Sequence, residues 1–152
     1  MILEYKRLRP NVVPPMRSNP SDVGLDLFFN PADGKIADIR AHESVLLETG
    51  LQFEIPHGYM LEIKNRSSIV SKKGLIVGAC VCDPGYSGEV KVNLLSIGLF
   101  TLQQIKPGDK IAQAVLIPVV TFKAYEKVNG ELYDYPVAMS DRKDGGFGST
   151  DK

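Results

Sequence analysis

Short runs of alternating apolar and polar residues, separated by turn-forming residues, constrain the fold of this chain most. Clear examples are residues 51–55 and 59–64, which flank a Pro-His-Gly turn and which we expect to be partner strands. The 152 residues contain no heptad pattern and no amphipathic helix of useful length, and they suit a single domain. The sequence therefore predicts an all-β sandwich or barrel.

Further elements follow from the same periodicity and from turn chemistry. Additional strands are predicted at residues 2–8, 22–29, 44–49, 100–102, 111–117 and 121–125. One helical turn is predicted at residues 69–73, closed by Gly74, with Ser67 or Ser68 as its N-cap.

Residues 78–90 form the most informative stretch of the sequence. An apolar run ends at Asp83, a Pro-Gly pair reverses the chain, and a second alternating run begins at Val90, which predicts a β-hairpin. The bend carries a carboxylate that can accept a proton and the phenol of Tyr86, which can stack on a sugar. The hairpin is therefore a candidate small-molecule site. The alternative is an ordinary turn, because Asp, Pro and Gly are common turn residues.

Two other segments favour a nucleotide as the ligand. Residues 65–68 read Asn-Arg-Ser-Ser, and residues 142–150 combine an arginine with Ser149 and Thr150. A guanidinium with nearby hydroxyls is a common way to hold phosphate oxygens. Phe147 lies among glycines in a segment that cannot form a core, so we expect a flexible tail that orders over a ligand, with a tail of no role as the alternative. The predicted domains are residues 1–139 and a C-terminal arm, residues 140–152.

Two polar residues interrupt segments that are otherwise apolar. Asp26 lies between Leu25 and Leu27 in a predicted strand, so it either pairs with a cation or basic side chain or faces solvent at an edge. Gln113 interrupts a strand that is apolar on both faces, so its amide is either hydrogen-bonded in the core or directed into a site.

Charge and cysteine content narrow the class of partner. The net charge is zero, so we expect no stable nucleic-acid or membrane binding, and any anion must be bound by individually placed residues. Cys80 and Cys82 are two residues apart in one strand, where a disulfide between them would be strained. We expect reduced thiols in a cytoplasmic protein, or inside a host cell for a viral protein. The segment at residues 1–7 lacks the apolar core of a signal peptide.

Five motifs in order give the chain a resemblance to the homotrimeric dUTPases. They are Val23-Gly24-Leu25-Asp26-Leu27, Asn65-Arg66-Ser67-Ser68, the bend from Asp83 to Glu89, the segment from Pro107 to Gln113, and the segment from Arg142 to Thr150. Each motif is short, but five in this order extend from residue 23 to residue 150 and make the resemblance specific.

The resemblance implies a jelly-roll subunit, a homotrimer with shared active sites, and a flexible glycine-rich C-terminal arm. It implies hydrolysis of dUTP to dUMP and pyrophosphate by attack of water on the α-phosphorus. Such a dUTP diphosphatase limits uracil incorporation into DNA and supplies dUMP for thymidylate synthesis.

The resemblance also implies roles for individual residues. Asp83 would orient and deprotonate the attacking water, and Asp26 would hold Mg²⁺ through a water. The substrate-binding residues would be Arg66, Ser67, Ser68, Val81, Tyr86, Gln113, Arg142, Phe147, Gly148, Ser149 and Thr150. Tyr86 would lie against the deoxyribose, and Phe147 would stack on uracil. The wall of the uracil pocket would be Gly78, Ala79, Cys80 and Cys82.

Some positions depart from the family pattern, and two alternatives remain. The family usually has glycine at Cys80 and isoleucine at Cys82, and the asparagine that often reads the uracil edge is not evident in residues 77–79. One alternative is a dCTP deaminase-like enzyme, although Asn93 stands where that enzyme needs a glutamate. The other is a nucleotide-dependent regulatory protein on the same fold.

Overall fold

The structure, a computed structural model, describes residues 1–98, 102–130 and 132 of the chain. It divides into two compact units, Met1–Thr121 and Phe122–Lys152. The second unit is described at residues 122–130 and 132, where the side chains of Phe122, Tyr125 and Val128 are exposed. The predicted boundary between residues 139 and 140 lies outside the described residues and stays a prediction.

The first unit confirms the predicted all-β class. Its described residues form eleven strands and one short helix. The strands are β1 (Glu4–Arg7), β2 (Leu25–Phe28), β3 (Ala37–Arg40), β4 (Ser44–Glu48), β5 (Leu51–Glu54), β6 (Tyr59–Lys64), β7 (Leu75–Val77), β8 (Val81–Cys82), β9 (Lys91–Ser96), β10 (Leu102–Ile105) and β11 (Lys110–Pro118), and the helix is α1 (Ser67–Lys73). No helix in the part of the chain that the structure describes has the length and apolarity needed to cross a bilayer.

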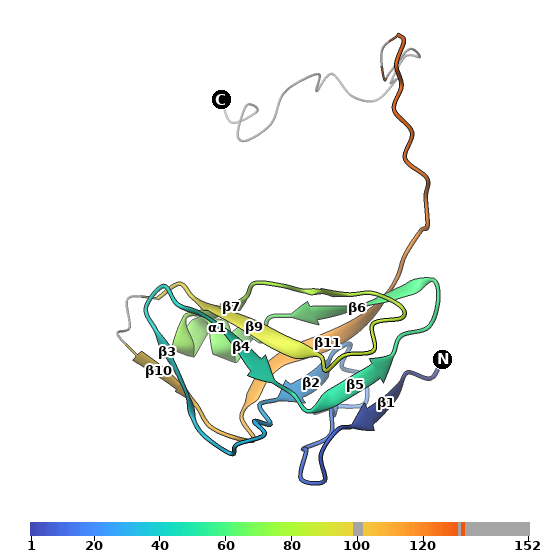
Figure 1. Ribbon diagram of the computed structural model, residues 1–152. Coiled ribbons are helices and arrows are strands. Elements are labelled where there is room, and N and C mark those ends of the chain that lie inside the picture. Colours follow the sequence, from blue (N-terminus) through green and yellow to red (C-terminus); the bar gives the residue numbers. More distant parts are fainter. Residues whose placement is uncertain (99–101, 131, 133–152) are drawn as a thin grey trace. The chain divides into compact units, whose positions relative to one another are not determined.

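Two sheets carry most of the fold (Figure 1). One has the strand order β2-β11-β6-β8, and the other has the order β4-β9-β7. The pairs β1-β5 and β3-β10 complete the structure. Every one of these strand pairs is antiparallel.

Alternate side chains of the strands build one hydrophobic core. In β9, Val92 and Leu94 are fully buried, whereas Lys91 is exposed. Leu61 and Ile63 of β6 belong to the same core cluster as these β9 residues, so the two main sheets share one interior. The period-two pattern seen in the sequence is the cause, because it places one apolar face on each strand.

Strand pairing differs from two sequence predictions. Residues 51–55 and 59–64 do form strands, but β5 pairs with β1, whereas β6 pairs with β11 and β8. The predicted hairpin at residues 78–90 is also wrong in its pairing. β8 pairs with β6 in one sheet and β9 pairs with β4 and β7 in the other, so the bend connects two sheets. β8 and β9 each place a side chain against the hydrophobic core. The sequence pattern therefore does not show which strand each one pairs with, and only the three-dimensional fold decides it.

The N-cap of the helix and the predicted strand at residues 121–125 also differ from the sequence predictions. The predicted helical turn is confirmed, and Gly74 ends α1 in the left-handed region with φ of 62°. Its N-cap residue, however, is Arg66 in an extended conformation with no side-chain capping bond, and Ser67 is already the first helical residue. Residues 121–125 form no strand. Phe100 and Thr101, in another predicted strand, lie outside the described residues.

Asn30 joins three segments of the first unit beneath the surface. Its side chain is nearly buried, and its amide nitrogen donates to the carbonyls of Val13 (3.2 Å), Phe28 (3.3 Å) and Thr49 (2.8 Å). Its amide oxygen accepts from the Val13 nitrogen at 3.0 Å. The sequence places this residue in a turn-rich loop and gives no sign of this role.

We expect Asn30→Ala to lower the free energy of unfolding by at least about 2 kcal/mol, because buried carbonyls would lose their donor. Asn30→Asp should cost more, since a carboxylate would face the same carbonyls. Urea denaturation followed by circular dichroism measures both effects. Asn11→Ala, at an exposed position, is the control and should stay within about 0.5 kcal/mol of the wild type. An Asn30→Ala variant as stable as this control would contradict the role.

Candidate active site

Asp26 is a buried carboxylate with two basic partners. It is only 7% exposed, yet both of its carboxylate oxygens contact a cation. Arg66 Nε lies 2.8 Å from Oδ1, and Lys110 Nζ lies 2.7 Å from Oδ2. The Ser18 hydroxyl also donates to Oδ2, at 3.2 Å. Of the two alternatives that the sequence leaves open for Asp26, the structure shows pairing with basic side chains and not exposure at an edge.

Three segments meet at this carboxylate because of strand register. β11 lies between β2 and β6, with Gln113 opposite Asp26 on one side and Lys64 on the other. β6 ends just before Arg66, so the guanidinium is delivered to the same place. The Gln113 amide nitrogen donates to the Asn65 carbonyl at 2.8 Å.

Asp26, Arg66 and Gln113 line a polar cavity of about 360 Å³, which we call the Arg66 cavity. Its lining consists of Ser18, Asp22, Val23, Gly24, Asp26, Arg66, Ser67 and Gln113. A side chain at residue 24 would collide with the Gln113 side chain, so glycine at this position leaves room for the Gln113 amide. A guanidinium, hydroxyls and an amide in one cavity suit phosphate oxygens. Ser68, predicted with Ser67, is not among the lining residues.

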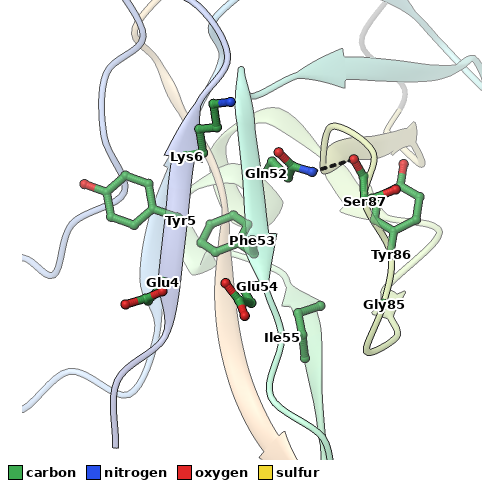
Figure 2. Close-up of a pocket in the computed structure, with 10 residues that line it drawn as sticks. All are labelled: Glu4, Tyr5, Lys6, Gln52, Phe53, Glu54, Ile55, Gly85, Tyr86 and Ser87. Carbon is green, nitrogen blue, oxygen red and sulfur yellow. Dashed lines mark hydrogen bonds between the residues drawn. The ribbon is translucent and has the colours of Figure 1, made fainter.

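Asp83 and Tyr86 lie in a tight turn away from this lining. The Tyr86 nitrogen donates to the Asp83 carbonyl at 3.2 Å, and Gly85 between them has φ of 86°. Proline followed by a glycine of positive φ is typical of a type II turn. Tyr86 lines a different cavity, of about 450 Å³, together with residues of β1 and β5 (Figure 2). The structure thus does not bring Tyr86 and the Arg66 cavity together within one chain.

In the predicted uracil wall, Gly78 and Ala79 are exposed, whereas Cys80 and Cys82 are half-buried. Val81, predicted to bind substrate, is 57% exposed. Two backbone groups of this segment are already paired, since the Gly78 nitrogen donates to the Asn93 carbonyl (3.0 Å) and the Cys80 carbonyl accepts from Ile63 (2.7 Å). The Gly78 N–H is therefore not available to a base, whereas the Cys80 carbonyl retains a second lone pair.

The two cysteines are free thiols, as predicted. Burial raises the pKa of the Cys82 thiol, and the neighbouring Asp83 and Cys80 raise it further. Both causes disfavour the thiolate.

The structure adds two residues to the site that the sequence did not single out. Lys110 lies within the fourth motif, and this location is the only indication in the sequence that it belongs to the site. Ser18 lies in an irregular proline-containing stretch and gave none. The arm residues predicted to close the site, Arg142, Phe147, Gly148, Ser149 and Thr150, lie outside the described residues.

Comparison with known proteins identifies the family. The family model described as dUTPase matches residues 11–151. The chain belongs to the dUTPase family. A deoxyuridine 5'-triphosphate nucleotidohydrolase of Hydrogenobaculum sp. is 35% identical over 152 residues, covering 99% of this chain and 98% of the relative. The dUTPase relative from Aquifex aeolicus, which has the same full name, is 40% identical over 123 residues, covering 78% and 80%.

Solved dUTPase structures share the fold. Staphylococcus bacteriophage 80alpha dUTPase with dUPNHPP gives a TM-score of 0.80 at 24% identity and covers 97% of each chain. The dUTPase of phage phi11 of S. aureus, described with a structural Mg(II) ion, gives 0.75 at 23% identity and covers 86% of this chain and 99% of its own. The predicted jelly-roll β-sandwich is confirmed as the dUTPase fold.

The raised pKa of Cys82 predicts slow alkylation near neutral pH, because only the thiolate reacts. In a Cys80→Ser variant, Cys82 is the only cysteine, and burial and Asp83 still disfavour its thiolate. In the folded variant, the rate at which iodoacetamide alkylates Cys82 should still rise with pH in a range where the alkylation rate of the urea-unfolded variant is already constant. Identical pH profiles for the folded and unfolded chains would contradict the shift.

Proposed function

We propose that the protein hydrolyses dUTP to dUMP and pyrophosphate through attack of water on the α-phosphorus. Membership of the dUTPase family supports the reaction, and so do the relatives that are named for it. The observation that carries the proposal is the cavity lined by Arg66, Ser67 and Gln113 together with Asp26, which is paired with Arg66. This cavity offers both donors for phosphate oxygens and a carboxylate for a hydrated cation.

In this proposal the cavity binds the triphosphate. Arg66 and Ser67 donate to phosphate oxygens, and Gln113 turns its amide from the Asn65 carbonyl toward the substrate. Arg66 is tied to Asp26 by an ion pair, so a triphosphate competes with the carboxylate for the guanidinium. Lys110 and Ser18 still contact Asp26 when Arg66 is engaged elsewhere, so the buried charge keeps partners.

The donor set fits Mg²⁺ bound mainly by the substrate. In the described ranges no group of three or more His, Cys, Asp or Glu residues could hold a metal ion. Mg²⁺ retains several waters and commonly binds to one or two carboxylates plus substrate phosphates, which fits a cavity whose lining includes the carboxylates of Asp22 and Asp26. Asp26 would hold a water of the ion. When bound, Mg²⁺ would neutralise charge on the phosphates.

Asp83 and Tyr86 supply the second half of the proposed site. The Asp83 carboxylate orients the attacking water and accepts its proton, and it also holds the sugar 3′-hydroxyl. The Tyr86 ring lies against the deoxyribose and leaves no room for a 2′-hydroxyl. A side chain at Gly88 would lie 2.5 Å from the Tyr86 hydroxyl, so glycine permits the position of the ring.

We propose that the two halves meet between chains in a homotrimer. The Arg66 cavity does not include Asp83 or Tyr86, which is consistent with one chain supplying the phosphate donors and a neighbour supplying the turn. The C-terminal arm, with Arg142 and Phe147, would complete the site from a third chain. A cytoplasmic location also stays a prediction.

Neither alternative function gains support. The Asn93 side chain, at the position where a deaminase needs a glutamate, donates its amide to the Ser44 hydroxyl at 2.8 Å. An amide cannot exchange protons with a cytosine ring as a carboxylate does. The relatives are hydrolases by name, which favours hydrolysis over deamination or a purely regulatory role.

We expect purified protein with Mg²⁺ to release pyrophosphate from dUTP but not from dCTP, dTTP or UTP, and to lose this activity with EDTA.

Asp83→Asn should lower kcat about 10²–10⁴-fold, because the proposed base is removed, while the Kd for dUTP changes little. Asp33→Asn, at an exposed loop position, is the matched control and should leave kcat unchanged. Undiminished turnover by Asp83→Asn would remove Asp83 from the role of base. No release from any nucleotide, or ammonia release from dCTP, would overturn the proposed function.

A further inference from the structure

Residues 83–90, which we call the crossing loop, connect two sheets and carry both Asp83 and Tyr86. The loop leaves β8 in one sheet and enters β9 in the other. Residues 83–87 are exposed, and the chain becomes buried only at Val90. A loop with so little burial of its own needs specific contacts to keep its two functional side chains in place.

The end of the crossing loop is bound to Gly50 and to the first two residues of β5. The Gly50 nitrogen donates to Glu89 Oε1 at 2.6 Å, and the Val90 nitrogen donates to the Leu51 carbonyl at 2.8 Å. Gln52 reaches across to the Ser87 carbonyl at 2.7 Å (Figure 2). Of these three contacts, the one between the Gly50 nitrogen and the Glu89 carboxylate involves a charged group. The Glu89 side chain is 14% exposed. Charge-assisted hydrogen bonds are about twice as strong as neutral ones.

Arg9 gives Glu89 a second partner from a distant part of the chain. Arg9 Nη2 donates to Glu89 Oε1 at 3.3 Å and to the Asn30 carbonyl at 2.6 Å. Gly50 has φ of 68°, and a side chain there would collide with Val12, so glycine is required to present this N–H. Glu89 is therefore held from two directions.

Glu89 is linked to Tyr86 through its backbone. The Tyr86 hydroxyl donates to the Glu89 carbonyl at 3.1 Å. One residue thus holds the phenol with its carbonyl and contacts Gly50 and Arg9 with its carboxylate. A shift of Glu89 would move the ring directly.

We propose that Glu89 is a positioning residue that fixes Tyr86 and Asp83 for the reaction, an inference that rests on the proposed function. Its carboxylate does not touch the substrate. It acts by holding the crossing loop against Gly50 and Arg9, so that the ring excludes a 2′-hydroxyl and the Asp83 carboxylate meets the water.

Three variants test the kinetic consequence. Glu89→Ala should lower kcat/KM for dUTP about tenfold or more and should reduce the preference for dUTP over UTP. Glu89→Gln keeps an acceptor for Gly50 and should recover most of both. Glu48→Gln is the matched control, because Glu48 Oε2 also lies near Arg9 Nη2, at 3.6 Å. The same oxygen accepts from the Ala32 nitrogen, a residue outside the crossing loop. This control should stay within about twofold of the wild type.

The preference for dUTP over UTP distinguishes positioning from loss of stability, because unfolding lowers both rates equally. If Glu89→Ala does not fold, Glu89→Asp carries the same test, since it keeps the charge but is shorter by one methylene group. Wild-type preference and wild-type kcat/KM in whichever of these two variants folds would overturn the proposal.

Hydrogen exchange without nucleotide tests the positioning independently of activity. In Glu89→Ala or Glu89→Asp, the hydrogen-bonded amides of Gly50 and Val90 should exchange about tenfold faster or more than in the wild type and in Glu48→Gln. Unchanged exchange would overturn the positioning role. If the wild type released no pyrophosphate from dUTP, the proposed function would fail, and exchange would still decide whether Glu89 holds the loop.

Discussion

The buried carboxylate of Asp26 is the constraint on which the rest of the site depends. A charge that is only 7% exposed is costly unless it is paired, and its partners come from different segments: Arg66 after β6 and Lys110 at the start of β11. Strand register then sets Gln113 opposite Asp26. Pairing this charge therefore assembles the polar cavity that we assign to the triphosphate.

The second functional group is built differently, from a turn rather than from a strand. The crossing loop carries Asp83 and Tyr86 between two sheets, and its contacts to residues 49–52 replace the burial that it lacks. Asp26 and its partners line a cavity at the ends of paired strands, whereas Glu89 holds a surface loop. A site assembled from both, in different chains, would link phosphate binding to correct assembly.

Sequence reasoning succeeded where the signal is local. Period-two alternation predicted most strands and Gly74 predicted the helix end. The apolar surroundings of Asp26 raised a basic partner as one of two alternatives, and the structure shows that partner. It failed where the outcome depends on distant residues. The hairpin prediction missed that β8 and β9 enter different sheets, and no local pattern shows that Arg9 meets Glu89, 80 residues away. Ser18 and Asn30 have roles that only tertiary contacts reveal.

The most direct test of the shared site is complementation between two inactive variants. Arg66→Gln disables the phosphate cavity and leaves the crossing loop intact, whereas Asp83→Asn does the reverse. When the two chains are co-expressed in equal amounts, random assembly with sites shared between chains should restore about a quarter of the wild-type activity per site, since each half must come from the correct chain. A mixture as inactive as either variant would show that both halves belong to one chain and would contradict the proposal.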